Sequence, residues 1–379
     1  MLESLEIGRT LIAQNNVEIL DLQTEVHALR MAKEPVQKRL DSYKYPVLTL
    51  PSEIVAEVFL RFLPVYPNTP SLTGLYSPFV LTHICHRWRE IACTTPELWR
   101  AIDLSYFPAA RKNFCVASAP SLAPLWLERS GSLPLSFHYD CDNESADAAL
   151  DSSPRILSTL IQYRARWEHV RFYLSGVGQL NLINGPMPML HTLDLWVKSR
   201  RHSAESTGKL LPFQSQDLPL LRSFKLGGWE SVGITLPWSH LTSLQLDRMH
   251  AADYVPILKQ ATLLVNLTLD VHGPEVQLSR DADVQLLHLQ SLTSVPYLDC
   301  NPNLIKIFVT PALVSLRLGE SLLGSSDSQC IESLKAFISK SGCQLQKLQI
   351  ISARTSMKAY HEAFPSIPSF DVDAYEPRD

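Results

Sequence analysis

The amino-acid sequence predicts an α+β protein in which helices come first and a parallel sheet follows. Three patterns carry this prediction: heptad spacing of apolar residues before residue 45, helical spacing between residues 50 and 104, and a strand motif that recurs afterwards. The 379 residues are therefore expected to form an N-terminal helix (1–45), a three-helix module (46–104), a repeat domain (105–370) and a flexible acidic tail (371–379).

The first 45 residues have the pattern of one long helix with a coiled-coil seam. One set of apolar residues is spaced by multiples of seven: Leu5, Ile12, Ile19, Val26 and Leu40. A second set fills the other seam position of the later heptads: Leu22, Leu29 and Val36. Lys33 interrupts the seam, and Pro35 is expected to bend or break the helix. The seam indicates either self-association or folding of the helix onto its own chain.

The segment from Leu50 to Leu104 is predicted to form three helices. Pro51 suits the first position of a helix, and Pro64 is expected to end that helix. Between them lies one wide apolar stripe: Ile54, Val55, Val58, Phe59, Phe62 and Leu63. A second helix is expected to start at Ser77 and to carry the apolar residues Leu81, Ile84, Cys85, Trp88, Ile91 and Ala92. A third starts at Pro96. Surplus apolar helix surface of this kind is typical of a partner site.

Several sequence anchors occur in this module together and in order. They are Leu50-Pro51-Ser52-Glu53-Ile54, Cys85-His86-Arg87-Trp88-Arg89 and Pro96-Glu97-Leu98-Trp99. The stretch resembles an F-box, the module by which substrate receptors dock on the Skp-type adaptor of cullin–RING ubiquitin ligases. Its long loop between Leu63 and Phe79 resembles that of F-box proteins of mushroom-forming fungi. The alternative, a helical core fragment of an unrelated α/β protein, does not explain the anchors together.

The resemblance implies which side chains contact the adaptor. These are Leu50, Pro51, Ile54, Val55, Val58, Phe59, Leu63, Leu81, Ile84, Trp88, Leu98 and Trp99.

Beyond residue 104, the unit apolar-x-x-apolar-x-apolar recurs along the chain. Its clearest copies are Leu190/Leu193/Leu195, Leu221/Phe224/Leu226, Leu241/Leu244/Leu246, Leu264/Leu267/Leu269, Leu313/Leu316/Leu318 and Leu345/Leu348/Ile350. Steps of 20 and 23 residues between neighbouring copies indicate stacked repeats, each supplying one short strand. Amphipathic helices are expected between some copies, including one closed by Gly342.

This half resembles the leucine-rich-repeat receptors attached to F-boxes, although the Asn or Cys that closes the motif is absent. The resemblance implies an irregular α/β solenoid with a parallel sheet. Residues that alternate with the inward leucines form a hypothetical substrate-reading surface: Asp194, Trp196, Lys225, Gln245, Asp247, Thr268, Asp270, Arg317 and Gln349. Ordinary solvated strand faces are the alternative for any one of them, and Trp196 is the expected anchor.

Composition narrows the class of protein. A charge of −4 and a pI of about 6.3 give no basis for nucleic-acid binding, and no stretch has the length and apolarity of a membrane span. Seven cysteines without a C-x-x-C pair, and no signal peptide, suit an intracellular protein of the cytoplasm or nucleus. No nucleotide, nucleophile-elbow or metalloprotease motif is present, so no catalytic residue, metal or cofactor is expected.

The sequence therefore favours a non-catalytic substrate receptor of a Skp-cullin-F-box-type ubiquitin ligase, which binds an adaptor and an unidentified protein target. The alternatives are an interaction scaffold of the same build that delivers nothing for degradation, and an enzyme whose site the motifs do not reveal.

Overall fold

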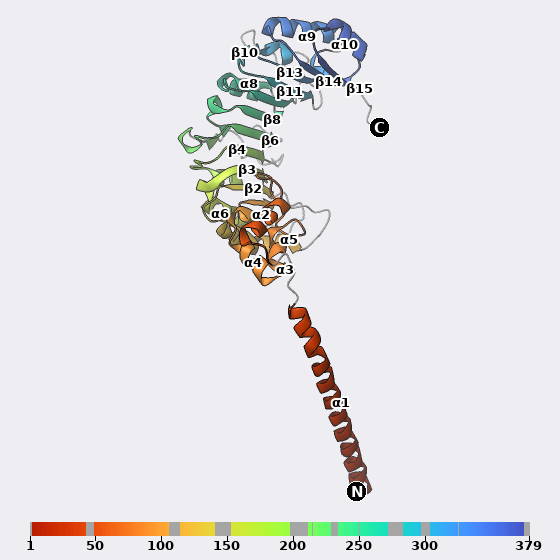
Figure 1. The fold of residues 1–379 in the computed structure, drawn as a ribbon. Helices are drawn as coiled ribbons and strands as arrows, with labels where there is room; N and C mark the ends of the chain where they lie inside the picture. Colours follow the sequence, from red (N-terminus) through yellow and green to blue (C-terminus); the bar gives the residue numbers. More distant parts are fainter. Residues whose placement is uncertain are drawn as a thin grey trace. The chain divides into compact units, whose positions relative to one another are not determined.

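The computed structural model describes residues 2–42, 49–105, 114–140, 153–197, 211–213, 215–228, 234–249, 251–271, 283–296, 304–324 and 326–374. The chain divides into two compact units, residues 1–58 and 59–379, and each is described by itself. The predicted α+β class is confirmed, because helices occur together with one large parallel sheet (Figure 1).

Helix α1 (Leu2–Ser42) covers the region of the heptad pattern. Pro35 lies inside the helix, which continues for seven more residues, so the expected break at this proline is absent. A proline removes a single N–H from the helical ladder, and the flanking turns remain bonded. From Arg9 to Ser42 the side chains are exposed.

The helical module consists of α2 (Ser52–Phe62), α3 (Pro78–Ile84), α4 (His86–Cys93) and the 3₁₀ helix η2 (Pro96–Trp99). Ser77 caps α3 as predicted, since its Oγ accepts a hydrogen bond from the N–H of Phe79 at 3.2 Å. The predicted single second helix is wrong. Cys85 is extended and separates α3 from α4, and its Sγ accepts a hydrogen bond from the N–H of Trp88 at 3.4 Å. Cys85 therefore begins a new helix instead of continuing the old one.

Within the described residues, eleven strands form one sheet in the order in which they follow along the chain, with β5, β7, β10 and β12 outside it. The strands are β1 (Ala101–Leu104), β2 (Leu135–Asp140), β3 (Trp167–Leu174), β4 (Thr192–Val197), β6 (Ser223–Gly228), β8 (Ser243–Met249), β9 (Asn266–Val271), β11 (Ser291–Pro296), β13 (Ser315–Gly319), β14 (Lys347–Ala353) and β15 (Ser369–Ala374). Each pairs in parallel with its neighbours.

Helices and short strand pairs fill the connections. The helices are α5 (Phe114–Arg129), α6 (Ser153–Gln162), η3 (Arg164–Arg166), α7 (Val177–Ile183), η4 (Ser215–Asp217), η5 (Trp238–His240), α8 (Ala251–Gln260), η6 (Leu304–Ile307), η7 (Glu320–Leu322), α9 (Asp327–Ser341) and α10 (Met357–Ala363). The short parallel pairs are β5 (Leu211–Pro212) with β7 (Ile234–Thr235), and β10 (Val284–Gln285) with β12 (Phe308–Val309). Gly342 ends α9 in the left-handed conformation (φ 65°), as predicted.

The repeated leucines form the core of the sheet, as predicted. In β4, β8 and β9, the two inward residues of each strand are at most 1% exposed. These residues are Leu193, Leu195, Leu244, Leu246, Leu267 and Leu269. The alternation of side chains along a strand then places the intervening polar residues on the opposite face.

Main-chain hydrogen bonds join successive strands of the sheet just before several of the strands begin. The carbonyl of Arg222 accepts two N–H groups, from Thr242 at 2.9 Å and from Ser243 at 3.0 Å. The same two-to-one pattern recurs at the carbonyls of His191, Thr242, Val265, Gln290 and Val314. These main-chain hydrogen bonds satisfy the N–H and C=O groups at the positions where the strands begin. They do not depend on the type of side chain.

A buried carboxylate joins the segments that follow β13 and β14. Glu320, only 4% exposed, accepts hydrogen bonds from the N–H groups of Arg354 at 2.5 Å and Thr355 at 3.1 Å, and from the hydroxyl of Tyr360 at 2.9 Å. Burial opposes ionisation of Glu320, but these hydrogen bonds outweigh it and hold its pKa below the ordinary value.

Two predicted segments end differently from expectation. The tail predicted from residue 371 is wrong as far as Ala374, because strand β15 pairs with β14 and places Asp371 opposite Gln349. Residues 375–379 lie outside the described part of the chain. At the other edge, β1 falls within residues assigned to the helical module, and it pairs with β2 as the first strand of the sheet.

Candidate functional site

Helix α2 has one buried and one exposed apolar face. Val55 and Phe59 are 3% and 1% exposed, whereas Ile54, Val58 and Phe62 are 51%, 55% and 39% exposed. The exposed residues are four positions apart, so they form a continuous stripe along the helix. Leu50, at 36%, precedes the helix. Because apolar surface is stabilised by removal from water, such a stripe favours a partner.

Aromatic rings fix the helices of the module in place. The ring of Phe59 lies edge-on to that of Trp88, with centroids 4.9 Å apart. Phe79, Trp99 and Trp126 form a second cluster with centroids 5.1 to 5.5 Å apart, which joins η2 to α5. Edge-to-face packing of this kind stabilises beyond area burial alone. The helical module and α5 therefore share one core.

Five of the residues predicted to contact an adaptor are buried. Val55, Phe59, Leu81, Leu98 and Trp99 are at most 4% exposed, so the prediction of direct contact is wrong for them. The indole N–H of Trp99, for example, donates to the carbonyl of Ala92 at 2.7 Å. Large apolar side chains are drawn into the core when a neighbouring helix lies within reach, and spacing alone does not show which face that is.

The other predicted contacts remain at the surface. Leu50, Pro51, Ile54, Val58 and Ile84 are exposed, and Leu63 and Trp88 are half-buried. The structure thus reduces the predicted set to seven accessible positions.

The loop between α2 and α3 is anchored to the sheet. The hydroxyl of Tyr66 donates to the carboxylate of Glu168, and the guanidinium of Arg100 lies 3.4 Å from the centre of the Tyr66 ring. Arg100 also lies 3.6 Å from Glu168. Burial raises the pKa of Tyr66 above its ordinary value, so the phenol stays protonated and acts as a donor.

Further hydrogen bonds extend this anchor along the loop. The carbonyl of Pro67 accepts from the hydroxyl of Ser136 at 2.5 Å, and the carbonyl of Pro70 accepts from the N–H of Asp103 at 2.9 Å. The segment therefore rests on β1, β2 and β3, which gives it a defined conformation despite its prolines.

The anchored loop exposes apolar side chains that the sequence did not single out. Leu75 and Tyr76 are 74% and 69% exposed, and the ring of Tyr76 stacks on that of Phe62 with centroids 6.4 Å apart. Val65 is exposed as well. These residues lie among turn formers, and only the presence of large apolar residues in a Pro-rich loop signals them in the sequence.

On the sheet, the predicted substrate-reading residues fall into two adjacent rows. The first row crosses every strand of the sheet: Asp103, His138, Arg171, Asp194, Lys225, Gln245, Thr268, Thr293, Arg317, Gln349 and Asp371. The second contains Asp140, Tyr173, Trp196, Gly227, Asp247, Asp270 and Val295. Strand register thus brings together all nine residues that the sequence proposed.

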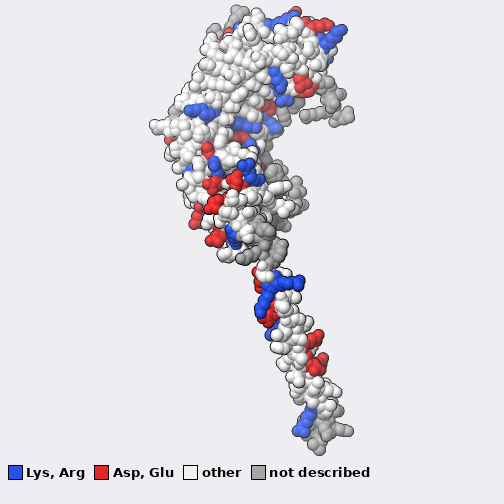
Figure 2. Space-filling model, in the orientation of Figure 1, with Lys and Arg blue, Asp and Glu red and all other residues white. Residues whose placement is uncertain are grey.

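Charges in these rows are largely paired with one another. Arg171 lies 2.8 Å from Asp194, and Lys225 lies 3.3 Å from Asp247, which also accepts from the amide of Gln245 at 3.0 Å. Acidic and basic side chains are interspersed on the face seen in Figure 2. Such a surface presents local polar pairs rather than a field of one sign.

Trp196, the expected anchor, is half-buried and lies against the neighbouring strand. Its ring is nearly parallel to that of Tyr173, with centroids 5.5 Å apart and an angle of 16° between the planes. On the other side it covers Gly227, and the guanidinium of Arg248 lies 5.4 Å from its centre. The absence of a side chain at Gly227 lets the indole lean across the neighbouring strand. The result is a flat aromatic surface between charged pairs.

The described part of the chain contains no group of three or more His, Cys, Asp or Glu side chains placed to bind a metal ion. In the same residues, no helix is both long enough and apolar enough to cross a bilayer.

Neither a known protein family nor a curated protein matches the sequence.

Proposed function

We propose that this chain is the substrate-recognition subunit of a Skp-cullin-F-box-type ubiquitin ligase. In this proposal, the helical module is an F-box that docks on a Skp-type adaptor, and the repeats form an irregular leucine-rich-repeat solenoid that captures a protein target. A separate enzyme transfers ubiquitin. The chain itself supplies proximity, which turns an encounter in solution into an effectively intramolecular reaction.

The exposed stripe of α2 is the observation that carries the proposal. Ile54, Val58 and Phe62 are left outside the module's own core, although Val55 and Phe59 on the same helix are buried. The stripe begins at Ile54, the last residue of the Leu-Pro-x-Glu-Ile anchor by which the sequence resembles F-box proteins. A helix that served only its own core would bury its largest apolar side chains on a single face.

The sheet supports the second half of the proposal. Its polar face offers two aligned rows of side chains and a flat aromatic pair, Tyr173 and Trp196. Protein interfaces are commonly built from aromatic anchors surrounded by polar groups.

Adaptor binding by the full chain tests the proposal directly. The double substitution Ile54→Asp and Val58→Asp is expected to weaken binding to a purified Skp-type adaptor at least about tenfold, which corresponds to about 1.4 kcal/mol. The control carries Leu182→Asp and Leu287→Asp, which are 57% and 54% exposed and lie in the repeat region. Equal binding by both variants, or no binding by the wild type, would contradict the proposed docking role.

A further inference from the structure

The N-terminal helix α1 carries apolar side chains that no described part of its own unit covers. Large apolar residues along it are 47% to 66% exposed, among them Ile12, Ile19, Leu22, Val26, Leu29, Val36 and Leu40. Figure 2 shows that uncharged residues cover most of the visible side of the helix. An isolated helix in water gains little stability from its own backbone, so a helix of this length normally packs against something.

The exposed residues fall on a coiled-coil seam. Ile12, Ile19, Val26 and Leu40 occupy one heptad position, and Leu22, Leu29 and Val36 occupy the other. At a rise of about 1.5 Å per residue, α1 is about 60 Å long, which gives room for five heptads. Sustained heptads of this kind favour a second helix that runs alongside the first.

We infer that α1 binds α1 of a second copy of this chain, forming a parallel two-stranded coiled coil. The flanking charges favour a copy of the same helix. In a parallel pair, the residue directly before a seam position of the set Ile12, Ile19, Val26 and Leu40 lies near a residue of the partner helix. That partner residue is five places later in the sequence. Glu25 therefore faces Arg30 of the other copy, and by symmetry this pair forms twice.

Two polar seam residues define the register. Asn15 meets its equivalent when the copies are in register and parallel, and an Asn in the seam selects alignment at some loss of stability. Lys33 also meets its equivalent, and this like-charge contact weakens the pair. The expected dimer is consequently concentration-dependent rather than permanent.

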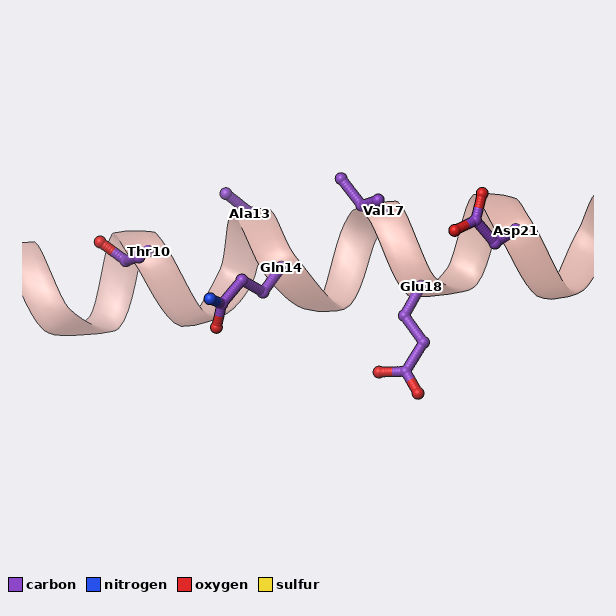
Figure 3. A pocket seen from close by; sticks show the side chains of 6 residues that line it. All are labelled: Thr10, Ala13, Gln14, Val17, Glu18 and Asp21. Carbon is purple, nitrogen blue, oxygen red and sulfur yellow. The ribbon is translucent and has the colours of Figure 1, made fainter.

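The opposite side of α1 does not offer a comparable site. A shallow, open groove is lined by Thr10, Ala13, Gln14, Val17, Glu18 and Asp21, all from successive turns of this single helix (Figure 3). Most of these side chains are polar or small. In the inferred dimer, the groove stays on the outside of the coil.

Sedimentation of the full chain over a concentration series tests the inference. The wild type is expected to shift from monomer to dimer as concentration rises. Ile19→Asp with Leu29→Asp is expected to raise the dimer dissociation constant roughly a hundredfold or more, because two charges per copy enter the seam. Val17→Asp with Met31→Asp is the matched control: these residues are 61% and 57% exposed, lie off the seam and receive the same charges.

A gain of affinity gives an independent check. Lys33→Leu removes the like-charge contact and is expected to lower the dissociation constant at least about tenfold. Ile12→Cys tests orientation: a parallel pair forms a disulfide between the two introduced thiols on mild oxidation, and Val17→Cys does not. Peptide mass spectrometry separates this link from those of the native cysteines.

Several outcomes would overturn the inference. A wild type that stays monomeric throughout the series means that α1 does not pair with a copy of itself. A dimer that survives the seam substitutions forms elsewhere, and a dimer without the Ile12→Cys link is not parallel. None of these readings depends on adaptor binding, so failure here is distinguishable from failure of the proposed function.

Discussion

The indole of Trp196 lies directly over Gly227, where a Cβ atom would stand 2.2 Å from Cε3 of the ring. The two residues are register partners on β4 and β6, so the contact is fixed by the strands themselves. The absence of a side chain at Gly227 therefore allows the Trp196 ring to lie against β6.

Gly227→Ala is expected to displace the Trp196 ring and to lower the free energy of unfolding by about 1–3 kcal/mol, as overpacking does. With Trp196→Ala already present, the same substitution should have little effect, because the ring that it strikes is gone. Urea unfolding of the two single variants and the double variant measures this coupling. Additive effects would mean that Gly227 is required for some other reason.

Tyr66→Phe removes the hydroxyl that donates to Glu168 and leaves a part-buried carboxylate with one donor fewer. We expect a loss of about 1–3 kcal/mol in unfolding free energy and faster proteolysis between Pro64 and Ser77. Tyr76→Phe is the matched control, because Tyr76 is 69% exposed on the same loop. If both variants are cut at the wild-type rate, the loop does not depend on this anchor.

The carboxylate of Glu320 predicts a pH dependence of stability. Its pKa is lowered on folding, so its stabilising contribution is complete above the ordinary value of 4.5 and is lost as pH falls through the lower folded value. Glu320→Gln should therefore be less stable than wild type at neutral pH, with a smaller difference in acid. Unfolding by urea at several pH values checks this.

Glu362 provides the comparison for that experiment. It is 69% exposed and pairs only with Lys358 of the same helix, at 3.8 Å. Glu362→Gln is expected to change the free energy of unfolding by no more than a few tenths of a kcal/mol, because exposed ion pairs contribute little. A profile for Glu320→Gln that runs parallel to wild type would show that Glu320 does not titrate differently in the folded protein.

Replacing Trp196 and Lys225 by Ala together is expected to reduce capture of the protein target at least about tenfold, because the pair supplies an aromatic surface and a neighbouring charge. Adaptor binding should stay unchanged, since neither residue lies on the helical module. Proximity labelling in the host with the proteasome blocked identifies candidate targets.

The half-life of those targets separates a degradation receptor from a scaffold. Targets that persist longer with the double variant than with the wild type support delivery for degradation. A half-life that does not respond to the variant, together with lost capture, would instead favour the scaffold.

Much of the sheet could be predicted from sequence because its signal is local. Leu193 and Leu195 face the core because side chains alternate along a strand. Copies of that pattern recur along the sequence at a distance that matches the length of one strand and its connection to the next. The end of α9 was predictable for a similar reason, since glycine adopts the left-handed closing conformation without the steric cost of a side chain.

The features that could not be predicted from the sequence depend on contacts between residues that are far apart along the chain. Cys85 interrupts a regular helical spacing, and nothing near it in the chain signals an extended residue. Leu98 and Trp99 have a motif that suggests a contact surface, yet Trp126 from α5 covers Trp99. The loop from Pro64 to Ser77 is fixed by Arg100 and Glu168, which the sequence alone does not place beside it.

The paired N–H groups that converge on one carbonyl before β6, β8, β9, β11, β13 and β14 have a bearing on how this chain can evolve. Cohesion between repeats comes from peptide groups, which every residue other than proline supplies in full. Polar residues on the exposed face of the strands can then change without removing these main-chain hydrogen bonds. The amino-acid sequence of the polar rows can therefore diverge faster than the fold that carries them.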